Sequence, residues 1–164
     1  MMRRGRALLL PLLLATAALA GCSLQPTGVS DGGEAPTGIA SGPTLYFLGA
    51  DGALEADPRT TQGLGSIAEA LALLLAGPGD SQQTDIPDGS ISRVGVTVSG
   101  DVIELTLPLA AYEVTPTAVD QIVCTAIASH VQHGGSTGAQ VRVGLTFGDW
   151  DREALRTCPL LAAE

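Results

Sequence analysis

The stretch VGVTVSGDVIELTL, residues 94–107, decides the fold because its hydrophobic period is two. Val94, Val96 and Val98 alternate with small or polar residues in its first half, and Ile, Leu and Leu alternate with Glu and Thr in its second half. Ser-Gly-Asp at residues 99–101 is typical of a tight turn. The pattern predicts an antiparallel hairpin with one buried and one polar face, as a sheet covered on one side requires.

Upstream lies GLGSIAEALALLLAGP, residues 63–78, whose boundary signals predict a helix. Ser66 and Glu69 have the spacing of a capping box, and apolar residues follow at helical spacing on one face. Gly77 suits a left-handed C-terminal position, and Pro78 cannot continue the helix. These signals lie about 11 residues apart, whereas a membrane span needs about 20 apolar residues. We therefore expect a helix that packs on the core of a domain rather than a membrane segment.

The remaining segments complete an alternation of strands and helices. We expect a strand over residues 44–48 with a short partner strand over residues 53–56, after which Asp-Pro-Arg at residues 57–59, with its Pro58, breaks the pairing. Thr-Pro at residues 115–116 opens a second helix that ends at a Gly pair, and a strand follows over residues 139–147. Residues 149–157 suit one or two helical turns. The predicted fold is an α+β domain, order β-α-β-β-α-β, whose mainly antiparallel sheet has both helices packed on one face.

Residues 1–21 have the features of a secretory signal peptide. A basic head, MMRRGR, precedes an apolar stretch of 14 residues, which is too short for a stable membrane anchor. The stretch ends in LAGC, which resembles the bacterial lipobox, where cleavage leaves a diacylated cysteine, here Cys22. The alternative is an ordinary signal peptide. Residues 22–43, rich in Gly, Ser, Pro and Thr, then form a lipidated flexible tether to a domain over residues 44–164.

The cysteines and the charge fit an envelope location. If Cys22 carries the lipid, Cys124 and Cys158 remain in an oxidising compartment, where a disulfide is expected and two buried free thiols are the alternative. Removal of three arginines with the signal peptide takes the formal net charge from −9 to −12, which disfavours nucleic-acid binding. We expect the protein on the extracytoplasmic face of the cell membrane, held there by its acyl chains.

Four motifs follow one another along the chain. They are an aromatic strand followed by an arginine, at Tyr46, Phe47 and Arg59; a helix ending in Leu-Leu-x-Gly-Pro, at residues 74–78; an apolar-Pro-x-Gly turn, at residues 86–89; and a Gln-x-x-x-Thr helix, at residues 121–125. In this order they resemble the GerMN domain, which is named from sporulation and spore-germination proteins and is common in bacterial envelope lipoproteins.

The resemblance covers residues 44–147 and implies a non-catalytic envelope domain without a shared ligand, cofactor or active site. Related domains work beside membrane sensor kinases and in sporulation, so the resemblance implies a protein or cell-wall partner. Cys124 departs from the family pattern, which often has an aromatic residue there, and the tail that contains Cys158 is an addition.

Several polar side chains are candidates for chemistry. His130 and His133 are three residues apart and, with Cys124, are candidates for a metal site or a Cys-His nucleophile. The alternative is that they are solvent-facing histidines at the C-terminal end of a helix, where the helix dipole favours cations. The acidic residues 149, 151 and 153 alternate as calcium ligands do, but the Gly and closing Glu of an EF-hand loop are missing. Arg59 is the best candidate for a binding residue, unless it pairs with a nearby carboxylate.

Two hypotheses about function follow. The first is a lipid-anchored, extracytoplasmic, non-catalytic binding or scaffolding module of the bacterial cell envelope, without a metal or other cofactor. The alternative is an envelope metal-binding protein or hydrolase that uses His130, His133 and Asp149. The alternative predicts a pocket that gathers these side chains with a free Cys124 thiol.

Overall fold

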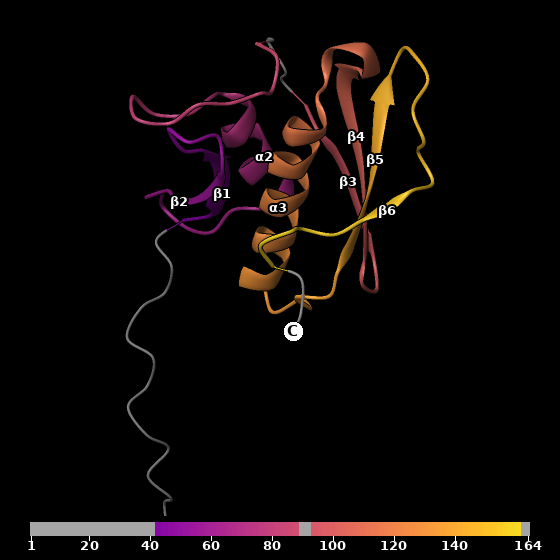
Figure 1. The fold of residues 1–164 in the computed structure, drawn as a ribbon. Helices are drawn as coiled ribbons and strands as arrows, with labels where there is room; N and C mark the ends of the chain where they lie inside the picture. Colours follow the sequence, from indigo (N-terminus) through magenta and orange to yellow (C-terminus); the bar gives the residue numbers. More distant parts are fainter. Residues whose placement is uncertain (1–41, 89–92, 162–164) are drawn as a thin grey trace, which may run out of the picture. The chain divides into compact units, whose positions relative to one another are not determined.

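The computed structural model describes residues 42–88 and 93–161, all within one compact unit of the chain (Figure 1). The predicted signal peptide, Cys22 and the tether up to residue 41 lie outside the described residues. The fold class is α+β, as predicted. The elements are β1 Thr44–Leu48, β2 Leu54–Pro58, α2 Ile67–Leu75, β3 Gly95–Ser99, β4 Val102–Ala110, the short 3₁₀ helix Ala111–Glu113, α3 Pro116–Gln132, β5 Gln140–Thr146 and β6 Leu155–Arg156. Within this part of the chain, no helix has both the length and the apolar character that crossing a membrane requires.

The strands form two sheets, where the sequence predicted one. Four strands are ordered β3-β4-β5-β6, and β1 and β2 form a separate antiparallel pair. Neighbours in the larger sheet are antiparallel except β4 and β5, which are parallel. The parallel pair follows from α3, because a helix between two strands carries the chain back across the sheet to start the second strand in the direction of the first.

Helices α2 and α3 form the middle layer of the part of the domain that the structure describes (Figure 1). They pack against each other and on one face of the four-stranded sheet, as predicted, while β1 packs on the helices from the opposite side. The core therefore joins three layers. It includes Phe47 of β1, Leu71 and Leu74 of α2, Ile103 of β4 and Ile122 of α3, each at most 1% exposed.

The β3–β4 hairpin has the predicted antiparallel pairing and a two-residue turn, with Gly100 at φ +59°. The alternation predicted for β4 is complete, since Ile103, Leu105 and Leu107 are buried and the residues between them are exposed. Val98 was expected in the core but is 46% exposed. It lies on β3, the outermost strand, near the turn, where the helices leave the sheet uncovered.

Both helices begin at the predicted caps. At α2, Ser66 Oγ accepts from Glu69 N at 3.2 Å and Glu69 Oε2 accepts from Ser66 N at 2.7 Å, which completes a capping box. Gly77 follows the helix with φ +98°, the left-handed conformation predicted for it. At α3, Thr115 Oγ1 accepts from Ala118 N at 3.0 Å.

Strand β2 runs through Pro58, so the prediction that this proline breaks the pairing was wrong. Pro58 lies opposite Thr44, and the next residue, Arg59, donates its N–H to Pro43 O at 3.0 Å. Because hydrogen-bonded and non-hydrogen-bonded pairs alternate along an antiparallel ladder, the nitrogen of Pro58 faces away from β1. A missing N–H on that side removes no ladder bond.

Candidate functional site

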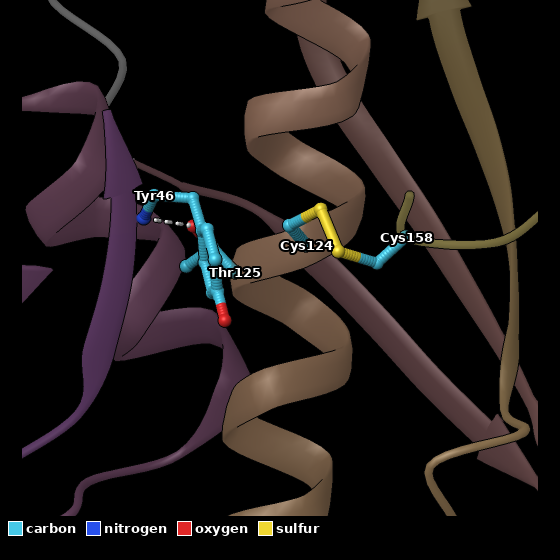
Figure 2. Close-up of a disulfide and its surroundings, with 4 residues drawn as sticks. All are labelled: Tyr46, Cys124, Thr125 and Cys158. Atoms are coloured by element: carbon cyan, nitrogen blue, oxygen red, sulfur yellow. Dashed lines mark hydrogen bonds between the residues drawn. A yellow bond between two sulfur atoms is a disulfide. The ribbon is translucent and has the colours of Figure 1, made fainter. Parts of the chain in front are cut away.

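Cys124 and Cys158, the two cysteines that the sequence paired, are joined by a disulfide with their Cα atoms 4.7 Å apart (Figure 2). Both residues are at most 1% exposed. The bond leaves α3 on the side opposite to Tyr46 and ties the C-terminal tail to the helix (Figure 2). Cys124 is therefore not the free thiol that a Cys-His nucleophile or a metal site would use.

The C-terminal tail closes one edge of the four-stranded sheet. Strand β6 pairs with the first part of β5, and side chains of the tail take over where this backbone pairing is absent. Trp150 Nε1 donates to Val143 O at 2.6 Å, and Arg152 Nη2 donates to Leu145 O at 2.8 Å. Neither side chain could be identified from the sequence, because nothing in the residue pattern marks a side chain that substitutes for a strand.

The acidic residues of the tail form a turn, so the expected helical turns over residues 149–157 are wrong. Asp151 Oδ1 accepts from Glu153 N at 3.0 Å and from Ala154 N at 3.1 Å. Such side-chain bonds to nearby N–H groups compete with helix formation. The turn bends the chain toward β6, and Asp151 Oδ1 accepts hydrogen bonds from two backbone N–H groups of that turn.

Arg156 connects the tail to α3 electrostatically. Burial raises the pKa of the Asp120 carboxyl on α3, and the positive charge of Arg156 partly opposes that rise. The Arg156 guanidinium also lies over the Trp150 ring, with Cζ 4.6 Å from the ring centroid, as in a cation–π contact. Arg156 within β6 and the disulfide of Cys158 just after β6 thus both connect the tail to α3.

His130 and His133 have local roles at the end of α3. His133 Nδ1 lies 2.6 Å from Ser129 O, one turn back along the helix. The His130 ring lies against Gly135, where a Cβ atom would overlap the imidazole. Among the described residues, no three His, Cys, Asp or Glu side chains are grouped closely enough to hold a metal ion.

Gln121 and Thr125, the ends of the Gln-x-x-x-Thr motif, bind the backbone of β1. Thr125 Oγ1 accepts from Tyr46 N at 3.0 Å (Figure 2), and Gln121 Nε2 donates to Tyr46 O at 3.2 Å. Further along α3, Gln132 Oε1 accepts from Thr44 N at 3.1 Å. On the second edge of β1, helix side chains therefore take the place of a neighbouring strand at Thr44 and Tyr46, and the backbone of Gln83 pairs with Leu48. The motif thus has a structural role.

Arg59 pairs with a carboxylate, the alternative that the sequence left open. Its Nε lies 2.7 Å from Asp57 Oδ2, and its Cζ lies 5.3 Å from the centroid of the Phe47 ring. The contact with Asp57 is an ion pair by distance but lacks the alignment of a hydrogen bond. These contacts hold the guanidinium against β1 and β2, and Arg59 lines neither the cleft beside α2 nor the hollows of the sheet described below.

A cleft of about 560 Å³ lies between residues 61–65 and α2. Leu64, Ala72 and Leu73 give it an apolar lining, and Glu69 adds a carboxylate. Hydrogen bonds from the backbone N–H and the hydroxyl of Ser66 lower the pKa of that carboxylate. Glu69 is therefore used by the helix cap, and the cleft has no second charged group in its lining.

Two shallow hollows, of about 320 and about 200 Å³, lie on the outer face of the four-stranded sheet, away from the helices. They meet at Thr106, which has Gly95 of β3 on one side and Gly144 of β5 on the other. A Cβ atom on Gly144 would come within 3.0 Å of Leu105 O. Because Gly95 and Gly144 have no side chains, the sheet is hollowed on both sides of Thr106. The sequence did not reveal this hollow, because the two glycines lie far apart in the chain.

Arginines gather around these hollows, although the chain as a whole is acidic. Arg142 Nη1 lies 2.8 Å from Glu104 Oε1, and a second carboxylate, of Glu153, is 4.0 Å from Arg142 Nε. Arg93 and Arg152 also line the hollows. We call the outer face around Thr106 the sheet surface. It combines the two hollows with the guanidinium groups of three arginines.

In comparisons with known proteins, no family model, no curated protein and no solved structure matches the chain. The resemblance to the GerMN domain therefore rests on the sequence motifs alone.

Proposed function

We propose that the chain is a lipid-anchored, extracytoplasmic, non-catalytic binding or scaffolding module of the bacterial cell envelope. The observation that carries the proposal is the buried Cys124–Cys158 disulfide, because structural disulfides form and persist in oxidising compartments. The disulfide uses two of the three cysteines of the chain. It leaves Cys22, at the end of the LAGC motif, as the cysteine that carries the lipid.

The sheet surface is the part of the module that we assign to a protein or cell-wall partner. Its three arginines, Arg93, Arg142 and Arg152, outnumber its two carboxylates. This balance favours a partner that presents carboxylates, since complementary charge steers association and sets its specificity. A shallow, hollowed sheet face suits contact with a macromolecule better than enclosure of a small molecule. The GerMN resemblance places such a partner beside a membrane sensor kinase or in sporulation.

Membrane fractionation of Cys22→Ala tests the anchor. The wild-type chain should sediment with membranes and incorporate a labelled fatty acid, and Cys22→Ala should lose the label and leave the membrane fraction. Ser23→Ala, one residue further on, is the matched control and should behave like the wild type. A Cys22→Ala chain that stays on the membrane with its label intact would refute the anchor.

A photo-crosslinkable side chain at Thr106 tests the binding role. Thr106 lies at the centre of the sheet surface and is exposed. In intact envelopes, it should give a discrete crosslinked species that the same probe at Ser136, an exposed position in the loop before β5, does not give. The same species from both positions, or from neither, would contradict the assignment of this surface.

A further inference from the structure

The two edges of the four-stranded sheet differ in their protection. The β5 edge is covered by β6, by the Trp150 and Arg152 side chains and by the disulfide that fixes the tail. At the other edge, among the described residues, β3 pairs with β4 alone. The β3 sequence, Gly-Val-Thr-Val-Ser, has neither charge nor proline, which are common devices against pairing at an open edge.

The geometry of the hairpin identifies the free backbone groups of β3. Ser99 and Val102 close a two-residue turn, and such flanking residues exchange both of their backbone hydrogen bonds. By alternation, Thr97 also faces β4, whereas the N–H and C=O groups of Val96 and Val98 point away from it. The free edge therefore offers two donors and two acceptors, next to a Val98 side chain that is 46% exposed.

We propose that this edge pairs with β3 of a second copy of the chain, antiparallel about a two-fold axis at Thr97. In this register Val96 lies opposite Val98 of the second copy, so the four free groups on each strand form four hydrogen bonds in total. Thr97 lies opposite its own symmetry mate in a non-hydrogen-bonded pair, where side chains are closest and Thr–Thr pairs are favourable. A two-fold interface needs such a self-complementary patch.

The charges at the two ends of β3 support the same register. Counted along the chain from Thr97, this register brings Arg93 of one copy toward Asp101 of the other, and the symmetry repeats this opposite-charge pair at the other end. Arg93 lies two residues before β3 and Asp101 lies in the turn after it, and both side chains are exposed. Within residues 42–88 and 93–161 neither side chain forms an ion pair, so each is free to pair with its counterpart.

The net negative charge of the chain acts against this pairing, but the repulsion is weak at the distances that salt screens. A formal net charge of −9 makes two copies repel each other at long range. That repulsion is screened over about 8 Å at physiological ionic strength, whereas the backbone bonds and the two ion pairs act at contact. This inference does not depend on the lipid anchor, because it uses contacts of the folded domain alone.

Oxidative crosslinking of the full-length chain tests the register. In a non-hydrogen-bonded pair the two Cα atoms lie about 4.5 Å apart, within the range that a disulfide spans. Thr97→Cys should therefore give a dimer on a non-reducing gel. Ser99→Cys lies on the same edge, but the two-fold register separates its copies by roughly 13 Å. This control should remain monomeric, like the wild type, whose behaviour reports any contribution of the native cysteines.

Charge reversal supplies a second, independent measurement on the Thr97→Cys background. Arg93→Asp places like charges opposite each other at both ends and should lower the yield and rate of the crosslink. Asp101→Arg should do the same, and the two changes together should restore both. Both positions are exposed, so the fold should tolerate them. Equal crosslinking of Thr97→Cys and Ser99→Cys, no crosslinking of Thr97→Cys, or a double reversal that fails to restore it would overturn the proposal.

Discussion

At the scale of single residues, the polar side chains that α3 presents to β1 fix the position of that strand. Gln121 and Thr125 are fully buried, and both bind the backbone of Tyr46. Gln121 Oε1 also accepts from Asp85 N at 3.0 Å and so holds the segment after α2. Because a buried backbone group without a partner is costly, these side chains must be polar although their surroundings are apolar.

The first prediction concerns Thr125→Val. Valine has nearly the shape of threonine but cannot accept the Tyr46 N–H, which remains buried. We expect a loss of about 1–3 kcal/mol in the free energy of unfolding, measured as a lower denaturant midpoint at unchanged slope. Ser129→Ala on the same helix is the control, because Ser129 Oγ is buried without a hydrogen-bond partner. Equal destabilisation by both substitutions would contradict the role of Thr125.

The second prediction concerns the pH dependence of the α2 cap. Hydrogen bonds from the Ser66 backbone N–H and hydroxyl hold the pKa of Glu69 below its ordinary value of 4.5. Because the folded-state pKa is lower than the unfolded one, ionised Glu69 stabilises the fold fully above pH 4.5. That contribution disappears as the pH falls through the lowered pKa. Glu69→Gln should unfold at lower denaturant than the wild type near neutral pH.

The difference between the wild type and Glu69→Gln should shrink as the pH falls below 4.5, in unfolding curves recorded over a pH series. Ser66→Ala is the companion variant, since it removes the hydroxyl and keeps the backbone donor. It should cost about 1 kcal/mol at neutral pH, as the loss of a cap does. A Glu69→Gln difference that stays constant through the acid range would show that the carboxylate does not act through ionisation.

At the scale of elements, the C-terminal tail substitutes for a long edge strand. Only Leu155–Arg156 has strand geometry, and the rest of the β5 edge receives donors from Trp150 and Arg152. The closed loop between Cys124 and Cys158 spans 34 residues, and cross-links of this size stabilise a domain by about 2–4 kcal/mol. The tail thereby protects the edge that an exposed strand would offer to other chains.

The third prediction concerns Trp150→Phe. Phenylalanine keeps an aromatic ring beneath Arg156 but leaves Val143 O without its donor. We expect a loss of about 0.5–1.5 kcal/mol in the free energy of unfolding. We also expect the substitution to speed up amide hydrogen exchange in β6 relative to the wild type, and to do so more than in β4, because the tail opens before the central strand does. Unchanged exchange in β6 would show that the indole N–H does not hold the tail in place.

The elements themselves could largely be predicted from the sequence, because their signals are local. The capping box at Ser66, the Thr115 cap and the period of two along β4 each depend on neighbouring residues. The arrangement of the sheets could not, since it depends on which strand edge is already occupied. β1 stays out of the larger sheet because α3 side chains bind its second edge, and no periodicity announces that Gln121 and Thr125 do so.

In the candidate site, too, features with a local sequence signal could be predicted, and features that depend on strand neighbours could not. Counting cysteines was enough to pair Cys124 with Cys158. Arg59, the binding candidate from the sequence, pairs with Asp57 instead. The sheet surface was missed, because Gly95 and Gly144 become neighbours of Thr106 only when β3 and β5 both join β4. Glycines that lie this far apart in the chain carry no local signal.

At the scale of the whole molecule, we propose that the three cysteines of the chain serve two tasks, both outside the cytoplasm. The disulfide between Cys124 and Cys158 closes the domain over its β5 edge, and we propose that Cys22 carries the lipid that holds the domain at the membrane. Both tasks require export, because an oxidising environment and lipidation at a lipobox are found outside the cytoplasm. The proposal therefore requires both modifications on the same protein molecule.

The intact mass of the protein extracted from membranes, recorded before and after reduction, tests this assignment most directly. We predict a chain that begins at Cys22 and carries acyl groups on that residue. It should have no thiol that reacts with an alkylating reagent after denaturation, and two reactive thiols after reduction. A chain that retains its first 21 residues, an unmodified Cys22, or two reactive thiols before reduction would contradict the account.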